Sequence, residues 1–279
     1  MSDRDDQPAA EETRRGRRRH RPRGRISVAG VLGELLISAG VLGELLISAG
    51  VLVLLFLGWQ LWWNDAVMAG SQSSAAAEIS RNWIEQDRLA RGHTALPTPE
   101  PTGFGDPVVA GAPRSTDAFA VLYVPRFGAD YHRSIAEGVG LDVLNSPQLG
   151  IGHYPGTQMP GEVGNFAVAA HRSANGGGMH LIHELQLGDP IYVQTSDGFY
   201  TYRFRDLEYV SPATVEVLDP VPHRPDATAV DRIVTLTSCN PFYSTAERII
   251  AYGVFESWQP TSAGAPAALA TIIAAQAQG

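Results

Sequence analysis

One long apolar segment limits what this chain of 279 residues can become. The 38 residues 26–63 are interrupted only by two glutamates, one glutamine and a few glycines and serines. As a helix they would be about 57 Å long, whereas a bilayer core needs only about 20 residues. Residues 45–63 carry no charge, and we take them as the membrane span, with Trp59, Trp62 and Trp63 at the outer interface. We therefore expect one N-terminal transmembrane helix.

The excess length of this segment comes from a tandem repeat. Residues 31–40 and 41–50 both read VLGELLISAG. Ten residues is not a helical period, and two copies are too few to build a solenoid. We interpret the duplicated decamer, residues 31–50, as a recent duplication inside a membrane anchor that comprises residues 26–63.

Charge is divided unevenly along the chain. Residues 1–25 carry nine arginines and five acidic residues, whereas the part from Asn64 onward carries 12 arginines and 22 acidic residues. The positive-inside rule predicts that residues 1–25 form a cytoplasmic tail in a single-pass plasma-membrane protein with an extracellular domain. Nucleic-acid binding is the alternative use of an arginine run, but a neighbouring apolar span favours topology. A cleavable signal peptide is disfavoured because its apolar region would be only about 7–15 residues.

Composition excludes several kinds of chemistry. All 21 basic residues are arginine, which excludes a Walker-type phosphate loop, a pyridoxal Schiff base and a lysine general base. Cys239 is the only cysteine, so there is no internal disulfide and no cysteine-based zinc cluster. His180 and His183 are spaced like metal ligands, but Glu184 would face elsewhere on a helix. We expect no metal site there.

Beyond the span, the sequence divides into three segments. Residues 64–115 predict an extracellular stalk, helical over 73–91, and then a Pro/Gly-rich linker. Residues 116–260 carry the folded domain, and residues 261–279 form an Ala-rich tail. About eight short strands with turn signals between them predict an all-β barrel or sandwich with short helices. The expected strands are 119–124, 165–170, 190–194, 199–204, 208–210, 215–218, 232–237 and 248–255, with helical turns near 134–144 and 178–185.

The candidate catalytic residues are at the ends of predicted strands. Cys239 precedes Pro241, which cannot extend a strand ladder, so the thiol is expected at a rim. His171 follows the strand 165–170, and Arg248 begins the next strand after the cysteine. A thiolate attacks a carbonyl, an imidazolium protonates the leaving amine and a fixed cation stabilises the oxyanion. The set therefore suits acyl transfer from an amide.

These motifs resemble those of sortases, the membrane-anchored cysteine transpeptidases of Gram-positive cell surfaces. The matching segments are TLTSC ending at Cys239, AVAAHR around His171 and Arg248 nine positions after the cysteine, with Ser238 where the family usually has Thr. The resemblance covers about residues 119–258. Among the subfamilies the sequence is most similar to class E, the housekeeping type, on its N-terminal anchor, a Tyr at position 154 and NPFYSTAERIIAYG after the cysteine.

The resemblance implies an eight-stranded sortase-type β-barrel and three roles: Cys239 as nucleophile, His171 as general acid/base and Arg248 as oxyanion and substrate stabiliser. It implies cleavage of an LAXTG or LPXTG sorting signal between Thr and Gly through a thioacyl intermediate. The acceptor would be an amine of the lipid-linked peptidoglycan precursor, and the partners would be surface proteins and the plasma membrane, with no nucleic acid. The expected substrate-binding residues are Tyr154, which would tune Ala against Pro in the signal, together with His153, Thr237 and Ser238.

No cofactor is expected. Some sortases use calcium, and the acidic residues available here are Asp130, Glu137, Glu162 and Asp219, but nothing in the sequence brings them together.

Other classes of protein remain open. A pilin-polymerising class C sortase would carry an Asp-Pro-aromatic lid and a C-terminal span, whereas here Asp106-Pro107 is followed by Val108 and we expect no second span. An L,D-transpeptidase also uses Cys, His and Arg, but with Gly before the cysteine and Arg soon after it. A non-catalytic surface-binding module would need none of the three, and an unreactive Cys239 would favour it.

Overall fold

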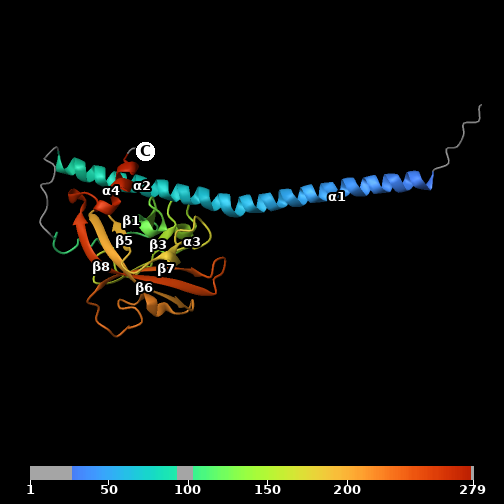
Figure 1. Ribbon diagram of the computed structural model, residues 1–279. Helices are drawn as coiled ribbons and strands as arrows, with labels where there is room; N and C mark the ends of the chain where they lie inside the picture. The colour runs from blue at the N-terminus through green and yellow to red at the C-terminus, as the bar shows by residue number, and fades with distance from the viewer. Residues whose placement is uncertain (1–26, 93–102, 278–279) are drawn as a thin grey trace, which may run out of the picture. The chain divides into compact units, whose positions relative to one another are not determined.

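The computed structural model describes residues 27–92 and 103–277, which divide into two compact units, the first ending at Phe56 and the second starting at Leu57 (Figure 1). The Arg-rich tail expected at residues 1–25 and part of the expected linker lie outside the described residues.

The N-terminal unit is built from a single helix, α1 (Val28–Gly58), which runs through both copies of the repeat. Its segment Gly40–Gly58 is long and apolar enough to cross a membrane, with a mean hydropathy of 2.4 and none of it buried inside the structure. Exposing this much apolar surface to water is unfavourable, so the helix fits a membrane anchor. The candidate span begins earlier than the predicted residues 45–63 and ends at Gly58, directly before the π-helical turn Trp59–Trp63.

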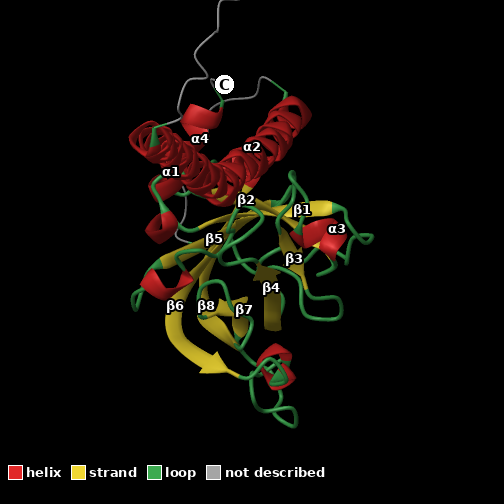
Figure 2. Ribbon diagram, turned by 90° about the vertical axis from the view of Figure 1, so that its right-hand side faces the viewer, coloured by secondary structure: helices red, strands yellow, loops and turns green. Residues whose placement is uncertain are grey.

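The second unit is organised around a closed barrel of eight strands in the order β1-β2-β3-β4-β7-β8-β6-β5 (Figure 2), which confirms the predicted barrel. β2 pairs with β3 and β4 pairs with β7 in parallel, and the other neighbours are antiparallel. The strands are β1 (Ala118–Tyr123), β2 (His132–Glu137), β3 (Ile151–His153), β4 (Gly164–Ala170), β5 (Pro190–Gln194), β6 (Gly198–Val210), β7 (Arg232–Asn240) and β8 (Glu247–Pro260). The short helices are α3 (Leu141–Leu144), α4 (Ala270–Gln276) and the 3-10 turns Pro125–Phe127, Ile182–Glu184, Val215–Leu218, Thr261–Ala263 and Ala267–Leu269.

The predicted number of strands is right, but two of the predicted strand assignments are wrong. Residues 199–204 and 208–210 form one strand, β6, which continues through a bulge in its pairing with β8. Residues 215–218 alternate in polarity like a strand, yet they form a 3-10 turn. β2 and β3 were missed. Residues 134–137, expected at the start of a helical turn, belong to β2, and only Leu141–Leu144 of the expected range 134–144 are helical. β3 has only three residues, and its central Gly152 lies so close to β2's end that a Cβ would be 2.2 Å from the Gly138 carbonyl oxygen.

The barrel interior determines which side chains remain available for chemistry. Phe166 and Val168 of β4 and Leu236 of β7 belong to the main hydrophobic core. Side chains alternate between the two faces of a strand. Thr237 and Cys239 of β7 therefore face outward, and the outer surface of β4 and β7 is where the candidate site lies.

Helix α2 (Asn64–Arg91) packs against the outside of the barrel together with α4, over β1, β2 and β5 (Figure 2). Small alanines allow this close approach: Ala76 belongs to a second apolar cluster with Val121, Tyr123, Tyr192, Phe199, Leu269 and Ile272. The segment 64–91 was expected to stand apart as a stalk, but it belongs to the same compact unit as the barrel. Its helix also begins nine residues earlier than the predicted range 73–91.

The described end of the expected linker is likewise attached to the barrel. Trp258 Nε1 donates a hydrogen bond to the Gly105 carbonyl oxygen at 3.0 Å, and Tyr200 OH donates to the Val108 carbonyl oxygen. Arg232 forms an ion pair with Asp106 at 3.3 Å. These contacts fix residues 105–108 on the barrel wall.

Candidate active site

Cys239 and His171 line the same pocket, which has a volume of about 540 Å³. β7 ends at Asn240, directly before Pro241, so Cys239 is one residue from the strand's end. His171 follows the last residue of β4. β4 and β7 are parallel neighbours, so their carboxyl ends meet at one edge of the barrel. This topology brings together a thiol and an imidazole that are far apart in the sequence.

Arg248 stands directly opposite Cys239 in the ladder between β7 and β8. Opposed residues of an antiparallel pair project from the same face of the sheet. The Arg248 Nη1 donates hydrogen bonds to the carbonyl oxygens of Thr245 and Glu247 at 3.1 and 3.0 Å. The guanidinium is therefore on the cysteine's side of the sheet, tied to the β7–β8 connection.

The remaining walls of the pocket come from segments that the sequence analysis did not connect with the site. Gln60, Asn64 and Asp65, from the π-helical turn and the start of α2, line it beside the cysteine and the histidine. The others follow β4 and β7 and are Arg172, Ser173, Ala174, Asn175, Tyr243, Ser244 and Thr245. No motif spacing signals that residues 60–65 approach Cys239, because only the packing of α2 brings them there.

His171 is held by the carboxamide of Asn145, whose Oδ1 lies 2.8 Å from its Nε2. Asn175 Nδ2 donates to the same oxygen at 3.0 Å. Partial burial lowers the pKa of His171, and the carboxylate of Asp65 acts in the opposite direction. The imidazole is thus oriented by neutral groups and influenced by one nearby negative charge.

Arg172, the second member of the HR pair, is buried beneath the segment that follows Cys239. It donates hydrogen bonds to Asn240 Oδ1 and, more weakly, to the Cys239 carbonyl oxygen. Its guanidinium also lies over the ring of Phe242, 4.2 Å from the centroid. Arg172 therefore fixes the backbone that carries the thiol.

The predicted substrate-binding residues separate into two groups. Tyr154 OH is 3.0 Å from Thr237 Oγ1, on the outward side of β7 that also carries Cys239. Ser238 points the other way, and its Oγ donates to the Ala170 carbonyl oxygen at 2.8 Å. The Ser238 hydroxyl therefore joins β7 to the end of β4 and is not presented to a ligand.

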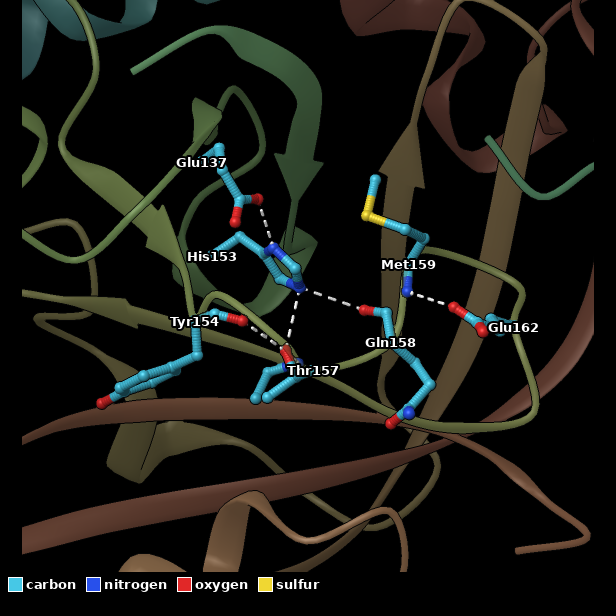
Figure 3. Close-up of polar contacts among 8 residues, drawn as sticks. Glu137, His153, Tyr154, Thr157, Gln158, Met159 and Glu162 are labelled. Carbon is cyan, nitrogen blue, oxygen red and sulfur yellow. Dashed lines mark hydrogen bonds and ion pairs between the residues drawn. The ribbon is translucent and has the colours of Figure 1, made fainter. Parts of the chain in front are cut away.

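His153 does not line the pocket, contrary to expectation. Its side chain is only 1% exposed, and its Nδ1 lies 2.6 Å from Glu137 Oε2 (Figure 3). Its Nε2 lies 2.9 Å from Thr157 Oγ1 and 3.1 Å from the Gln158 carbonyl oxygen. Both ring nitrogens are occupied inside the protein, so this histidine has no atom free for a substrate.

Among the residues that the structure describes, no group of three or more His, Cys, Asp or Glu side chains is placed to hold a metal ion. Two of the acidic residues considered for calcium are engaged elsewhere (Figure 3). Glu137 contacts His153, and Glu162 accepts a hydrogen bond from the Met159 backbone nitrogen at 2.9 Å.

Comparison with known proteins agrees with this arrangement. A family model described as the sortase domain matches residues 122–256. Sortase SrtE1 of Streptomyces coelicolor is 32% identical over 264 residues, 92% of this chain and 66% of its own length, so this chain spans just under two thirds of that relative. Sortase SrtE2 of the same organism is 31% identical over 248 residues, 85% of this chain and 86% of its own.

Solved structures show the same fold. The crystal structure of sortase E1 from Streptomyces coelicolor with a tripeptide in its active site is 36% identical, with a TM-score of 0.51, and the match covers 57% of this chain and 99% of that one. Together with the family model and the two relatives, the eight-stranded barrel leads to one conclusion: this chain belongs to the sortase family of transpeptidases.

Proposed function

We propose that this protein is a membrane-anchored housekeeping sortase of class E type, which cleaves an LAXTG or LPXTG sorting signal between Thr and Gly. The observation that carries the proposal is the shared pocket of Cys239 and His171, with Arg248 opposite the cysteine. The similarity to two Streptomyces class E sortases supports the subclass.

The proposed reaction has two acyl-transfer steps. The Cys239 thiolate attacks the Thr carbonyl carbon, the bond to the Gly nitrogen breaks, and the His171 imidazolium gives its proton to the leaving amine. The products are a thioacyl enzyme and the released glycine segment. An acceptor amine then attacks the thioester, neutral His171 takes its proton, and the Cys239 sulfur leaves as a thiolate. The sum is the exchange of one amide for another.

Arg248 is the proposed oxyanion stabiliser. Its present acceptors are two backbone carbonyl oxygens, so the guanidinium can exchange them for the negative charge that develops on the Thr carbonyl oxygen. Because it is paired with Cys239 across the ladder, its side chain already projects from the nucleophile's side of the sheet.

The substrate-binding surface that we propose is the outer face of β4 and β7. Thr237 lies on this face two residues before the nucleophile along β7, and the hydroxyl of Tyr154, which follows β3, is 3.0 Å from its Oγ1. Tyr154 is the residue that we propose tunes the preference for Ala or Pro in the signal. A tripeptide occupies the active site of the related sortase E1, which supports a peptide ligand here.

We also propose that the reaction takes place at the outer surface of the plasma membrane, with the N-terminus in the cytoplasm. Asp65 follows Gly58, the end of the candidate span, by seven residues, which limits their separation to roughly 25 Å of extended chain. Chain connectivity alone keeps the pocket near the bilayer, where a lipid-linked peptidoglycan precursor and a membrane-attached surface protein can both reach it.

The test uses the full chain in detergent micelles with paired LAXTG and LPXTG peptides and an amine acceptor, followed by mass spectrometry. We expect a thioacyl adduct on Cys239 and a Thr–acceptor conjugate, both absent in Cys239→Ala. The relative rates rank the two signals. A folded enzyme that forms no adduct with either peptide contradicts the proposal and directs the search to peptidoglycan stem peptides as donors.

A further inference from the structure

We propose that Asn145 is a positioning residue for His171 and that helix α2 braces this contact through Gln72. The inference rests on the proposed function, in which His171 moves protons to and from the reacting groups. Its evidence is a chain of hydrogen bonds that joins the helix next to the anchor to the imidazole.

The first link determines which nitrogen of His171 is available. Asn145 Oδ1 lies 2.8 Å from Nε2, and Asn175 Nδ2 donates to that same oxygen. A carboxamide oxygen only accepts hydrogen bonds, so Nε2 must carry a hydrogen. In the neutral ring this leaves Nδ1 as the basic nitrogen, and Nδ1 is the atom that exchanges the proton with the thiol and the leaving amine.

The second link fixes the loops that carry the two asparagines. Asn145 follows helix α3, and its backbone nitrogen donates to the Leu141 carbonyl oxygen at 3.0 Å. Gln72 of α2 is fully buried, and its Nε2 donates to the carbonyl oxygens of Ser146 at 2.9 Å and Asn175 at 3.1 Å. One side chain of α2 therefore holds both the residue after Asn145 and Asn175 itself.

Two glycines make room for this contact. A Cβ built at Gly150 or at Gly176 would come within 2.5 Å of the Gln72 carboxamide, and both glycines have a positive φ, +90° and +86°. Other residues adopt such a backbone only with strain. The loops are thus shaped to receive Gln72, which indicates a specific brace and not an incidental contact.

The neutral carboxamide of Asn145 also matters for the charge of the imidazole. The charged or titratable groups around His171 in the pocket are Asp65 from α2, Arg172 next in the chain, Cys239 from β7 and Tyr243 from the β7–β8 connection. A carboxamide orients the ring without adding another negative charge. A carboxylate in its place would favour the imidazolium.

The main test replaces Asn145 in the full chain, in detergent micelles, with Asn82→Ala on the exposed side of α2 as the matched control. We expect Asn145→Ala to lower kcat by about tenfold, the effect of one hydrogen bond to a charged group, with little change in KM. Imidazole 15N NMR should show His171 as the Nε2–H form in the wild type and as a tautomer mixture in Asn145→Ala. The control should change neither.

Two further variants separate positioning from general stability. Asn145→Asp should move the NMR titration of His171 to higher pH, a sign that mere loosening of the loop does not produce. Gln72→Ala should lower kcat less than Asn145→Ala, and the double variant should lose no more than Asn145→Ala alone, because both act through one contact. Gln86→Ala, exposed on the same helix, should have no effect.

The outcomes distinguish this inference from the proposed function. If Asn145→Ala keeps both its kcat and the Nε2–H signal, the positioning role is overturned. Strictly additive losses in the double variant would overturn the brace. If the wild type turns over no sorting peptide, the proposed function fails, while the NMR tautomer and its response to Asn145→Asp still test the contact directly.

Discussion

Two histidines in the catalytic domain are surrounded by polar partners, and the difference between their surroundings separates chemistry from architecture. His171 lies at the end of β4 and lines an open pocket with Cys239. Within the part of the chain that the structure describes, only its Nε2 has a hydrogen-bond partner, Asn145. His153 lies on β3 inside the protein, with Nδ1 on Glu137 and Nε2 on Thr157 and Gln158 (Figure 3).

The chemistry of its hydrogen-bond partners alone therefore does not mark a histidine as catalytic. A His–Glu contact resembles a catalytic pair more closely than a His–Asn contact does. Yet both ring nitrogens of His153 are hydrogen-bonded inside the protein, and the rings of Phe119 and Phe166 pack beside it. Buried polar groups of this kind are costly to leave unpaired, so the cluster holds β2 and β3 together. A proton-transfer group needs a free nitrogen and access to substrate, which only His171 has of the two.

The largest effect is expected from His171→Ala. Loss of a general acid/base lowers kcat by about 10²–10⁴-fold. Thermal unfolding should change little, because the residue is on the pocket wall. The measurement is transpeptidation of a sorting peptide alongside a melting curve. Activity near the wild-type level would show that the pocket histidine is not the proton donor.

The next largest effect is expected from Arg248→Lys. A lysine keeps the charge but loses the planar fork of donors, and removal of one oxyanion contact costs about 10²–10³-fold in kcat. Single-turnover formation of the thioacyl enzyme measures this directly. Arg203→Lys, which alters an exposed ion pair with Glu256, is the control. Equal rates for the two variants would remove Arg248 from the proposed mechanism.

His153→Ala should reverse the pattern seen at His171. It leaves the buried Glu137 without its partner, which we expect to lower the free energy of unfolding by about 2–4 kcal/mol. For a unit of this size, the Tm would fall by roughly 5–15 °C. The kcat of the folded fraction should stay within about threefold of the wild type, since His153 does not line the pocket of Cys239 and His171. A large loss of kcat with an unchanged Tm would contradict the structural role assigned to His153.

Tyr154→Phe removes a single hydroxyl contact with Thr237 and should destabilise the fold by about 1 kcal/mol. If Tyr154 tunes the signal, the ratio of kcat/KM values for LAXTG and LPXTG peptides should also change. Tyr209→Phe, with an exposed ring, provides the matched control. An unchanged ratio would mean that the Tyr154 hydroxyl contributes only to stability and not to the choice of signal.

The smallest effect is expected from Asp65→Asn. Burial holds the pKa of His171 below its ordinary value, and the Asp65 carboxylate raises it in part. Removing that charge disfavours the imidazolium, so the titration of His171, followed by NMR, should move to lower pH. Asp226→Asn, on an exposed loop, should not move it. A shift to higher pH after Asp65→Asn would contradict the inference that the Asp65 carboxylate raises the pKa of His171.

Three features could be predicted from the amino-acid sequence: the β-rich class, one apolar helix able to span a membrane, and the residues Cys239, His171 and Arg248 that carry the family motifs. These follow from local signals: polarity that alternates along strands, a proline that ends β7, and a run of apolar residues. The same local signals misplaced Val215–Leu218 and missed β2 and β3. β3 has only three residues, so it is defined by its pairing with β2 and β4 and not by its own pattern.

Tertiary packing, in contrast, separates the polar residues that serve the pocket from those that serve the fold. It buried His153 and brought Asn145, Asp65 and Gln72 into or behind the wall around His171. The physical reason is that burial and hydrogen-bond partners depend on contacts between segments far apart in sequence. Gln72 and Asn175 meet across 103 positions, a distance that no spacing rule spans.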